Sequence, residues 1–148
     1  MVITIDDIRL ECYSKLLRFS WRIRKRARGN LYELGFARNQ YSVLKHIDEG
    51  EAITLSELSH RVSRGRSNIT ALVDSLEERE LIRRIPDKSD RRVIRVELTE
   101  KGENVRAETI EAHEDFIRSM FKDIDDKEIH SLIELLETMD EKIGLSKF

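Results

Sequence analysis

The sequence predicts an α+β protein that is mainly α and carries one small β-hairpin. Apolar residues recur at spacings of three and four over several long segments, which is typical of amphipathic helices. Residues 93–98 instead alternate apolar and charged side chains, which indicates a half-buried strand. The chain contains a single proline among 148 residues, so few positions would interrupt a helix.

The length of 148 residues predicts about one domain. One cysteine excludes a disulfide within the chain. The N-terminus lacks the apolar region of a signal peptide, and no apolar stretch is long enough to cross a bilayer. We therefore expect a soluble, cytoplasmic protein with no membrane partner.

Charge is unevenly distributed along the chain, although the net charge is only −2. Residues 15–28 contain seven Lys or Arg and no acid, and residues 61–95 contain ten bases against six acids. Residues 103–141 reverse this balance, with thirteen acids against four bases. A basic part of this kind suggests a polyanionic partner. The alternative is that the charges only solvate helix faces.

Helices are expected at both ends of the chain. The first covers residues 6–29, a second covers about 39–48, a long helix follows Thr99 to about 122, and a last helix follows the cap signal at 125–128. The last two helices carry more apolar surface than a small domain can cover, which predicts a helical dimer interface. Packing of these helices against the first helix is the alternative. Apolar positions of the first helix are Ile8, Cys12, Leu16, Phe19 and Ile23.

The middle of the chain has the pattern of a helix-turn-helix. Thr54 and Glu57 form a capping box that starts a short helix, and a second helix with an apolar stripe follows after Ser63. Arginine matches guanine, asparagine matches adenine, and hydroxyls suit phosphate. The first turn of that second helix is polar and basic, with Arg64, Arg66, Ser67, Asn68 and Thr70.

A hairpin follows directly, with strands at 81–85 and 93–98 around a turn-rich segment. A hairpin in this place is a wing, and its tip carries Arg91 and Arg92. These arginines are expected to reach a phosphate or a narrow minor groove. We expect Asp90 to orient one of them through a bidentate contact. A solvated hairpin with incidental charge is the alternative.

At this point nearly the whole chain resembles the MarR family of transcriptional regulators. The most specific part is Asp90-x-Arg92-x-x-x-Val96-x-Leu98-Thr99 followed by Gly102, which is similar to the family's wing signature. "RSNITALVDSLEERELI" is similar to its recognition helix and the start of its wing. One departure is Glu80, where the family often has a glycine in a left-handed conformation, at a cost of about 1 kcal/mol for another residue.

The resemblance implies an obligate homodimer that binds a palindromic double-stranded DNA operator. Residues 31–98 would form the winged helix-turn-helix part, and residues 1–30 and 99–148 the helical dimerisation part. Arg64, Arg66, Ser67, Asn68 and Thr70 would face the major groove, and Arg92, with Arg91, the minor groove. The function expected is that of a repressor released from its operator by a small-molecule signal.

Members of this family commonly respond to small anions, often phenolic, that bind between the dimer helices and the winged domain. In this sequence Arg18, Arg22 and Arg26 share one face of the first helix, with Trp21 nearby. Arg18, Trp21 and Arg22 are therefore candidates for binding an aromatic carboxylate. Pairing of this stripe with the acidic C-terminal helices, or a plain solvated surface, are alternatives.

Cys12 lies roughly where the organic-hydroperoxide branch of the family keeps its reactive cysteine. The tyrosines of that branch are only partly matched here, so a buried core cysteine is favoured over a thiol-based oxidant sensor. A winged-helix module that binds proteins instead of DNA is a further alternative. The sequence shows no nucleophile–base motif, phosphate loop or metal-ligand spacing, so we expect neither an enzyme nor a cofactor or metal.

Overall fold

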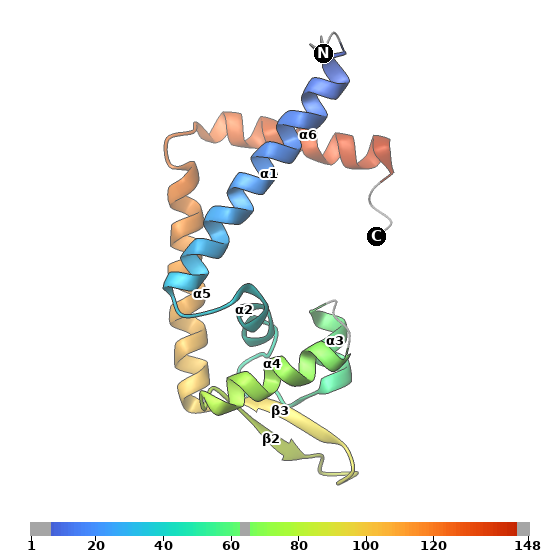
Figure 1. Ribbon diagram of the computed structural model, residues 1–148, viewed down its shortest axis with the longest axis vertical. Coiled ribbons are helices and arrows are strands. Elements are labelled where there is room, and N and C mark those ends of the chain that lie inside the picture. The colour runs from blue at the N-terminus through green and yellow to red at the C-terminus, as the bar shows by residue number, and fades with distance from the viewer. Residues whose placement is uncertain (1–6, 63–65, 145–148) are drawn as a thin grey trace, which may run out of the picture. The chain divides into compact units, whose positions relative to one another are not determined.

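The computed structural model describes residues 7–62 and 66–144, with the side chains of residues 66 and 67 outside that description. The chain divides into two compact units, residues 1–114 and 115–148. The functional division into 31–98 and two terminal segments stays a prediction. The elements follow one another as α1 (Ile8–Glu33), α2 (Arg38–Lys45), β1 (Ile53–Thr54), α3 (Leu55–Arg61), α4 (Arg66–Glu78), β2 (Ile82–Pro86), β3 (Ile94–Leu98), α5 (Glu100–Phe121) and α6 (Asp126–Ile143) (Figure 1).

The prediction of a mainly helical fold with a small β-hairpin is confirmed, and the sheet has one strand more than the hairpin. β3 lies between β1 and β2 and is antiparallel to both. Ile53 pairs with Val96, and Ile82 pairs with Leu98 at the end of the hairpin away from its turn. β1 is only two residues long, so its alternation is too short to be read from the sequence.

The core of the first unit lies where α2, α3 and α4 meet the sheet. Ile69, Val73 and Leu76 of α4 are fully buried, and they follow the predicted helical stripe. Other fully buried side chains come from α2, α3, the strands and residues next to them, namely Val43, Leu44, Ile47, Ile53, Leu58, Leu81, Ile82 and Val96. This interior fixes α3 and α4 relative to the hairpin.

Several helix caps agree with the sequence. The Thr54 hydroxyl accepts from the Glu57 N–H at 3.2 Å, and the Glu57 carboxylate accepts from the Thr54 N–H at 2.9 Å. Asp125 and Glu128 form a second capping box before α6. Thr99 caps α5, since its Oγ1 accepts from the Gly102 N–H at 2.9 Å. These contacts satisfy amides that have no partner within their own helix.

The predicted end of the first helix at residue 29 is wrong. α1 continues to Glu33, and the residue with positive φ after it is Gly35, at 85°. A glycine inside a helix costs only about 1 kcal/mol. Burial of Leu31 against the core offsets that cost and carries the helix past Gly29.

Glu80 has the left-handed conformation that the family pattern suggests for this position, with φ 61°. It stands at the turn from α4 to β2, and its N–H donates to the Glu77 carbonyl at 2.8 Å.

The backbone of Gly102 in α5 passes close to the backbone of Leu81. A Cβ added to Gly102 would lie 1.8 Å from the Leu81 carbonyl oxygen, so only glycine fits there.

The two terminal helices leave large apolar side chains uncovered. On α1, Ile8, Leu10, Leu17 and Phe19 are exposed. On α6, no described residue is buried although the helix has a clear apolar stripe. The exposed apolar residues of α6 are Leu132, Ile133, Leu135, Leu136 and Ile143.

Candidate nucleic-acid interface

The α3–α4 pair has the arrangement that the capping box and apolar stripe predict. Leu58 and Val62 from the α3 side and Ile69 from α4 are buried, which holds the two helices together. Asn68 and Thr70 are exposed on α4, on either side of buried Ile69. Exposed polar residues in the first turns of a helix can reach the edges of bases in a major groove.

The remaining predicted major-groove residues are less fully described. Arg64 lies outside the described residues. Arg66 begins α4 and Ser67 follows it, but their side chains lie outside the description. Residues 66–70 therefore form the first turns of α4. Of the predicted major-groove residues, Asn68 and Thr70 are those whose side chains are seen to be exposed.

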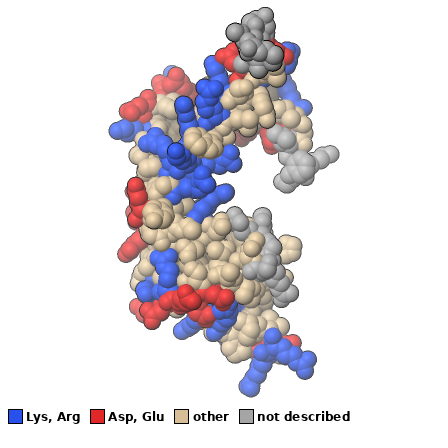
Figure 2. Space-filling model, viewed as in Figure 1, with Lys and Arg blue, Asp and Glu red and all other residues tan. Residues whose placement is uncertain are grey.

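The β2–β3 hairpin extends beyond the body of the first unit, and its tip carries positive charge (Figures 1 and 2). Lys88, Arg91 and Arg92 are all exposed in the segment between the two strands. Within the described residues, none of these three cations is paired with a carboxylate. They are available to a phosphate backbone.

Asp87 organises this tip, although the sequence pattern did not single it out. One carboxylate oxygen accepts from the Ser89 N–H at 2.8 Å, from the Ser89 hydroxyl at 2.6 Å and from the Asp90 N–H at 3.0 Å. The other oxygen pairs with Nε of Arg95. These hydrogen bonds, led by those of Ser89 and Arg95, lower the pKa of Asp87 well below its usual range.

Arg95 joins the hairpin to the start of α3. Its guanidinium donates to the Ala52 carbonyl at 2.9 Å and lies 3.7 Å from the carboxylate of Glu57. Glu57 is the partner of Thr54 in the capping box of α3. The wing and the helix-turn-helix are therefore connected through Asp87, Arg95 and Glu57. A pattern search could have found Asp87 only by its place as an acid followed two residues later by serine, which is typical of an Asx turn.

The predicted bidentate contact of Asp90 to a wing arginine is wrong for the described residues. Its carboxylate accepts from the backbone N–H of Arg92 at 3.0 Å, and no ion pair joins it to either guanidinium there. Its carbonyl accepts from the Val93 N–H at 2.9 Å. Asp90 thus orders the backbone of the tip and leaves the guanidinium groups of Arg91 and Arg92 outward.

Two other arginines of the hairpin, Arg83 and Arg84, form ion pairs with carboxylates, unlike Arg91 and Arg92 at the tip. Arg83 donates to Glu97 across the strands at 2.6 Å. Arg84 pairs with Glu77 and, at 2.5 Å, with Asp74, both of α4. These contacts fasten β2 to its neighbours, and their positive charge is balanced by acids.

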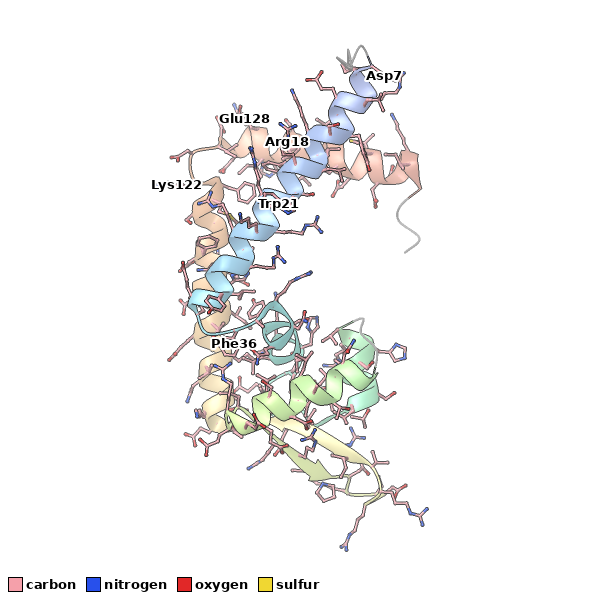
Figure 3. The ribbon with its side chains drawn as sticks, in the orientation of Figure 1. Asp7, Arg18, Trp21, Phe36, Lys122 and Glu128 are labelled. Atoms are coloured by element: carbon pink, nitrogen blue, oxygen red, sulfur yellow. The ribbon has the colours of Figure 1, made fainter. Side chains whose placement is uncertain are left out.

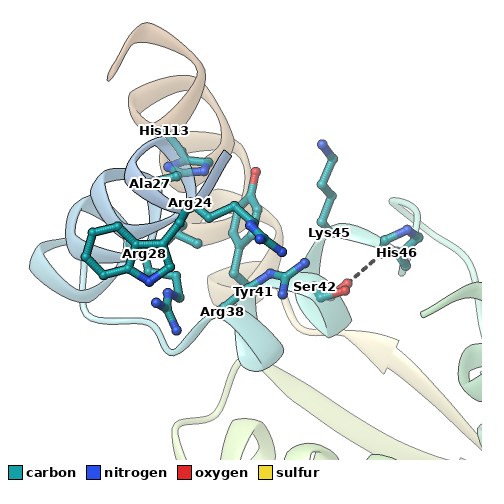
Figure 4. Close-up of a pocket in the computed structure, with 11 residues that line it drawn as sticks. Arg24, Ala27, Arg28, Arg38, Tyr41, Ser42, Lys45, His46 and His113 are labelled. Atoms are coloured by element: carbon teal, nitrogen blue, oxygen red, sulfur yellow. Dashed lines mark hydrogen bonds between the residues drawn. The ribbon is translucent and has the colours of Figure 1, made fainter. Parts of the chain in front are cut away.

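A cavity of about 450 Å³ lies elsewhere in the first unit, between α1, α2 and α5 (Figure 4). Trp21 lines it, whereas Arg18 and Arg22 are not among its lining residues. Arg18 and Trp21 both project from α1 (Figure 3). The lining residues are Trp21, Arg24, Ala27, Arg28 and Leu31 of α1, Arg38, Tyr41, Ser42, Lys45 and His46 of or next to α2, and His113 of α5.

Two titratable groups of this cavity are perturbed. His113 is buried, and its Nδ1 donates to the Asn30 side-chain oxygen at 2.7 Å. Burial lowers the pKa of His113, and the charge of Lys45 lowers it further. Burial raises the pKa of Tyr41, with Glu114 adding to the effect. Both rings are therefore favoured in their neutral forms.

The favoured prediction of a buried Cys12 is wrong. The thiol is free and exposed on α1. Its neighbours on that part of the helix, such as Leu10 and Tyr13, are exposed as well. Of the predicted apolar face of α1, Ile8, Cys12 and Phe19 are exposed, whereas Leu16 and Ile23 are partly buried. Within the described residues, no group of three or more His, Cys, Asp or Glu could hold a metal ion.

The capped α3, the outward polar start of α4 and the braced, basic hairpin define the class of a winged helix-turn-helix DNA-binding protein. Comparison with known proteins takes this further. The MarR family profile matches residues 36–94. Two Bacillus subtilis proteins described as uncharacterized HTH-type transcriptional regulators are similar over most of their length. YpoP is 35% identical over 72% of this chain and 75% of its own, and YsmB is 32% identical over 81% of this chain and 85% of its own.

A solved structure is similar over nearly the whole chain. The transcriptional regulator BldR from Sulfolobus solfataricus covers 97% of this chain and 99% of its own, with 29% identity and a TM-score of 0.67. This chain belongs to the MarR family of DNA-binding transcriptional regulators, which is not a family of enzymes. Members bind DNA operators, typically as dimers. None of the described helices combines the length and the apolar character needed to cross a membrane.

Proposed function

We propose that this chain is a homodimeric repressor that binds a palindromic operator and releases it in response to a small-molecule signal. The observation that carries the DNA-binding part is the braced hairpin tip, where Lys88, Arg91 and Arg92 are exposed and without a carboxylate partner among the described residues. Such cations gain more from a phosphate backbone than from water, because binding releases counterions.

The division of roles follows the geometry of the winged helix. Asn68 and Thr70, with Arg64, Arg66 and Ser67 around the start of α4, would contact base edges and phosphates in the major groove. Arg92, assisted by Arg91, would enter the adjacent minor groove. Asp90 and Asp87 would hold the tip backbone in the form that presents these arginines.

Dimer formation is supported by the exposed apolar residues of α1 and α6. A monomer in water would leave Leu132, Leu136 and Ile143 of α6 uncovered, at 42%, 45% and 60% exposure. Burial of one leucine stabilises an interface by about 1.5–3 kcal/mol. Two copies would place two recognition helices about 34 Å apart, as successive major grooves require. A signal that changes this spacing would release the operator.

Binding to DNA is tested with the purified chain and a labelled duplex of its own upstream DNA, titrated from about 50 to 200 mM salt against an unrelated duplex. Tight, salt-dependent and sequence-selective binding is the expected result. Equal weak binding to both duplexes would contradict operator recognition and favour a protein-binding role for the winged helix.

The exposed Cys12 supports a thiol-based oxidant sensor as a second candidate for the signal. In that case peroxide would weaken operator binding in the wild-type chain and not in Cys12→Ser. Equal operator binding by the two proteins before and after peroxide would eliminate this candidate.

A further inference from the structure

Arg95 of β3 contacts three separate segments of the chain. Its Nε donates to the Asp87 carboxylate in the turn of the wing, and its Nη1 donates to the Ala52 carbonyl, just before β1, at 2.9 Å. The same Nη1 lies 3.7 Å from the carboxylate of Glu57 on α3. A planar guanidinium can hold several acceptors in fixed directions at once. Arg95 therefore joins the turn of the wing to the chain that enters α3.

Arg95 stands where the sheet narrows from three strands to two. β1 is paired with β3 as far as Thr54, which lies opposite Arg95. From there toward the turn, the described sheet continues as β2 and β3, and its last pair is Pro86 with Ile94. Figure 1 shows these two strands running on from the body of the first unit to their turn. A two-stranded ribbon twists more strongly and is less stable than a wider sheet. The direction of the tip therefore depends on side-chain contacts at this boundary.

The guanidinium of Arg95 is engaged within the chain, unlike those at the tip. Its side chain is 32% exposed and two carboxylates lie within ion-pair distance. Arg91 and Arg92 are exposed, and neither has a carboxylate partner among the described residues. The hydrogen bonds of Ser89 and Arg95 hold the pKa of Asp87 well below its usual range, so this carboxylate stays charged at neutral pH. A cation that is already balanced in this way gains little from a phosphate, because few counterions are released.

The other ion-paired arginines of the hairpin make different connections. Arg83 donates to Glu97, which lies directly opposite on the neighbouring strand, so this pair lies within the hairpin. Arg84 pairs with acids of α4 and fastens β2 to that helix. Arg95 is the arginine that connects the turn of the wing with the start of α3. Arg83 is therefore a matched comparison for it, with the same side chain and an ion pair in the same hairpin.

We propose that Arg95 is a positioning residue for DNA binding, which holds the tip of the wing in a fixed direction relative to α3 and α4. It acts through Asp87, whose carboxylate also accepts from backbone N–H groups of the turn. The tip then meets the duplex at a fixed distance from the exposed start of α4. Part of the cost of ordering two contact surfaces is removed before DNA is bound. This role rests on the proposed contact of Arg91 and Arg92 with DNA.

The ion pair can be removed without a change of net charge. Asp87→Asn with Arg95→Gln, the charge-neutral variant, keeps an oxygen that can accept from the turn amides and loses the charged link. Fluorescence anisotropy with the tightest-binding duplex from the chain's own upstream DNA should show about tenfold weaker binding. The salt dependence should stay the same, because no phosphate contact is lost. A salt dependence reduced by about one counterion would mean that Arg95 itself contacts DNA, and would overturn the positioning role.

A second background shows whether Arg95 acts through the cations of the tip. In a chain with Arg91→Ala and Arg92→Ala, the charge-neutral change should weaken DNA binding less than about twofold, because the side chains that it positions are absent. Arg83→Gln in the otherwise unchanged chain should keep the affinity within about twofold of the wild type. Urea unfolding checks that each protein is folded. An equal loss in both backgrounds, or a loss of the same size in Arg83→Gln, would overturn the positioning role.

Arg92→Ala separates the positioning role from the proposed function. Weaker binding by Arg92→Ala together with full affinity of the charge-neutral variant would overturn the positioning role and keep the wing contact. Full affinity in both would remove the wing from the interface, and the positioning role with it. If the charge-neutral variant does not fold, Arg95→Lys replaces it, since lysine keeps the charge beside Asp87 but lacks the fork that also reaches Ala52. Binding about threefold weaker is then expected, and wild-type affinity would contradict the positioning role.

Discussion

The interior of the winged helix and the surfaces of α1 and α6 use the same residue types in opposite ways. Val43, Val73 and Val96 are fully buried within the first unit, whereas Leu135 and Ile143 of α6 are 62% and 60% exposed. Val73 belongs to the apolar stripe of α4, and Ile143 belongs to that of α6. A stripe predicts that a helix face will be covered, but it does not tell whether the cover comes from the same chain or from another copy.

The largest effect on stability should come from a change within the packed winged-helix region, where α5 begins. In Gly102→Ala the new Cβ would meet the Leu81 carbonyl oxygen at 1.8 Å, and backbone cannot move aside cheaply. We expect a loss of about 3 kcal/mol or more in the free energy of unfolding, measured by urea denaturation. Gly29→Ala is the matched control, since nothing lies within 4 Å of its Cβ, and it should leave stability unchanged or raise it by up to about 1 kcal/mol. Equal stability of the two variants would contradict the packing described for α5.

The exposed apolar surface of α6 is tested by placing charge on its apolar stripe. Leu132→Asp with Leu136→Asp should convert the dimer to a monomer, because each leucine stabilises an interface by about 1.5–3 kcal/mol and buried carboxylates oppose it. We expect the dissociation constant of the dimer to rise at least about a hundredfold, measured by analytical ultracentrifugation. Glu134→Gln, on the opposite side of the helix, is the control. A double variant that stays dimeric would place the interface elsewhere.

DNA affinity should also depend directly on the exposed cations of the wing. Arg92→Ala should weaken operator binding about tenfold and reduce the salt dependence by about one counterion, because one exposed cation is lost. Fluorescence anisotropy with a labelled operator measures both quantities. Lys127→Ala on α6 should change neither, and self-association should be the same in both variants. Unchanged affinity in Arg92→Ala would remove the wing from the interface.

The smallest expected effect is on stability and concerns the backbone of Glu80, at the turn from α4 to β2. Glu80 has φ 61°, which costs a residue with a side chain about 1 kcal/mol. Glu80→Gly should therefore stabilise the chain by up to about 1 kcal/mol in thermal or urea unfolding. Ala107→Gly, inside α5, should have the opposite sign at similar size. A destabilised Glu80→Gly would show that the contact of Glu80 with Lys101 outweighs the backbone cost.

Much of the fold could be predicted from local patterns. The capping pair Thr54 and Glu57, the stripe from Ile69 to Leu76 and the alternation in β3 each depend on neighbouring residues only. β1 and the true end of α1 could not be predicted, since both depend on partners distant in the sequence, Val96 for Ile53 and the core for Leu31. Glu80 was correctly identified as a strained position because the family pattern marks it.

The candidate sites were predictable to a smaller extent. Exposure of Arg91 and Arg92 agrees with the sequence, but the acid that binds an arginine at the wing is Asp87, eight residues before Arg95. Of the three residues of α1 that the sequence suggested for ligand binding, Trp21 lines the cavity, and whether any of them binds a ligand stays a prediction. The lining residues from α2, such as Arg38 and Lys45, could not be inferred from any spacing within α1.

The most direct test of the central claim is the mass of the protein–operator complex. Native mass spectrometry of the chain with the tightest-binding duplex from its own upstream DNA should show two copies per duplex, and the Leu132→Asp, Leu136→Asp variant should show little complex at the same concentration. A stable complex with one copy per duplex would contradict the view that α1 and α6 are covered by a second chain and that two winged helices read the DNA together.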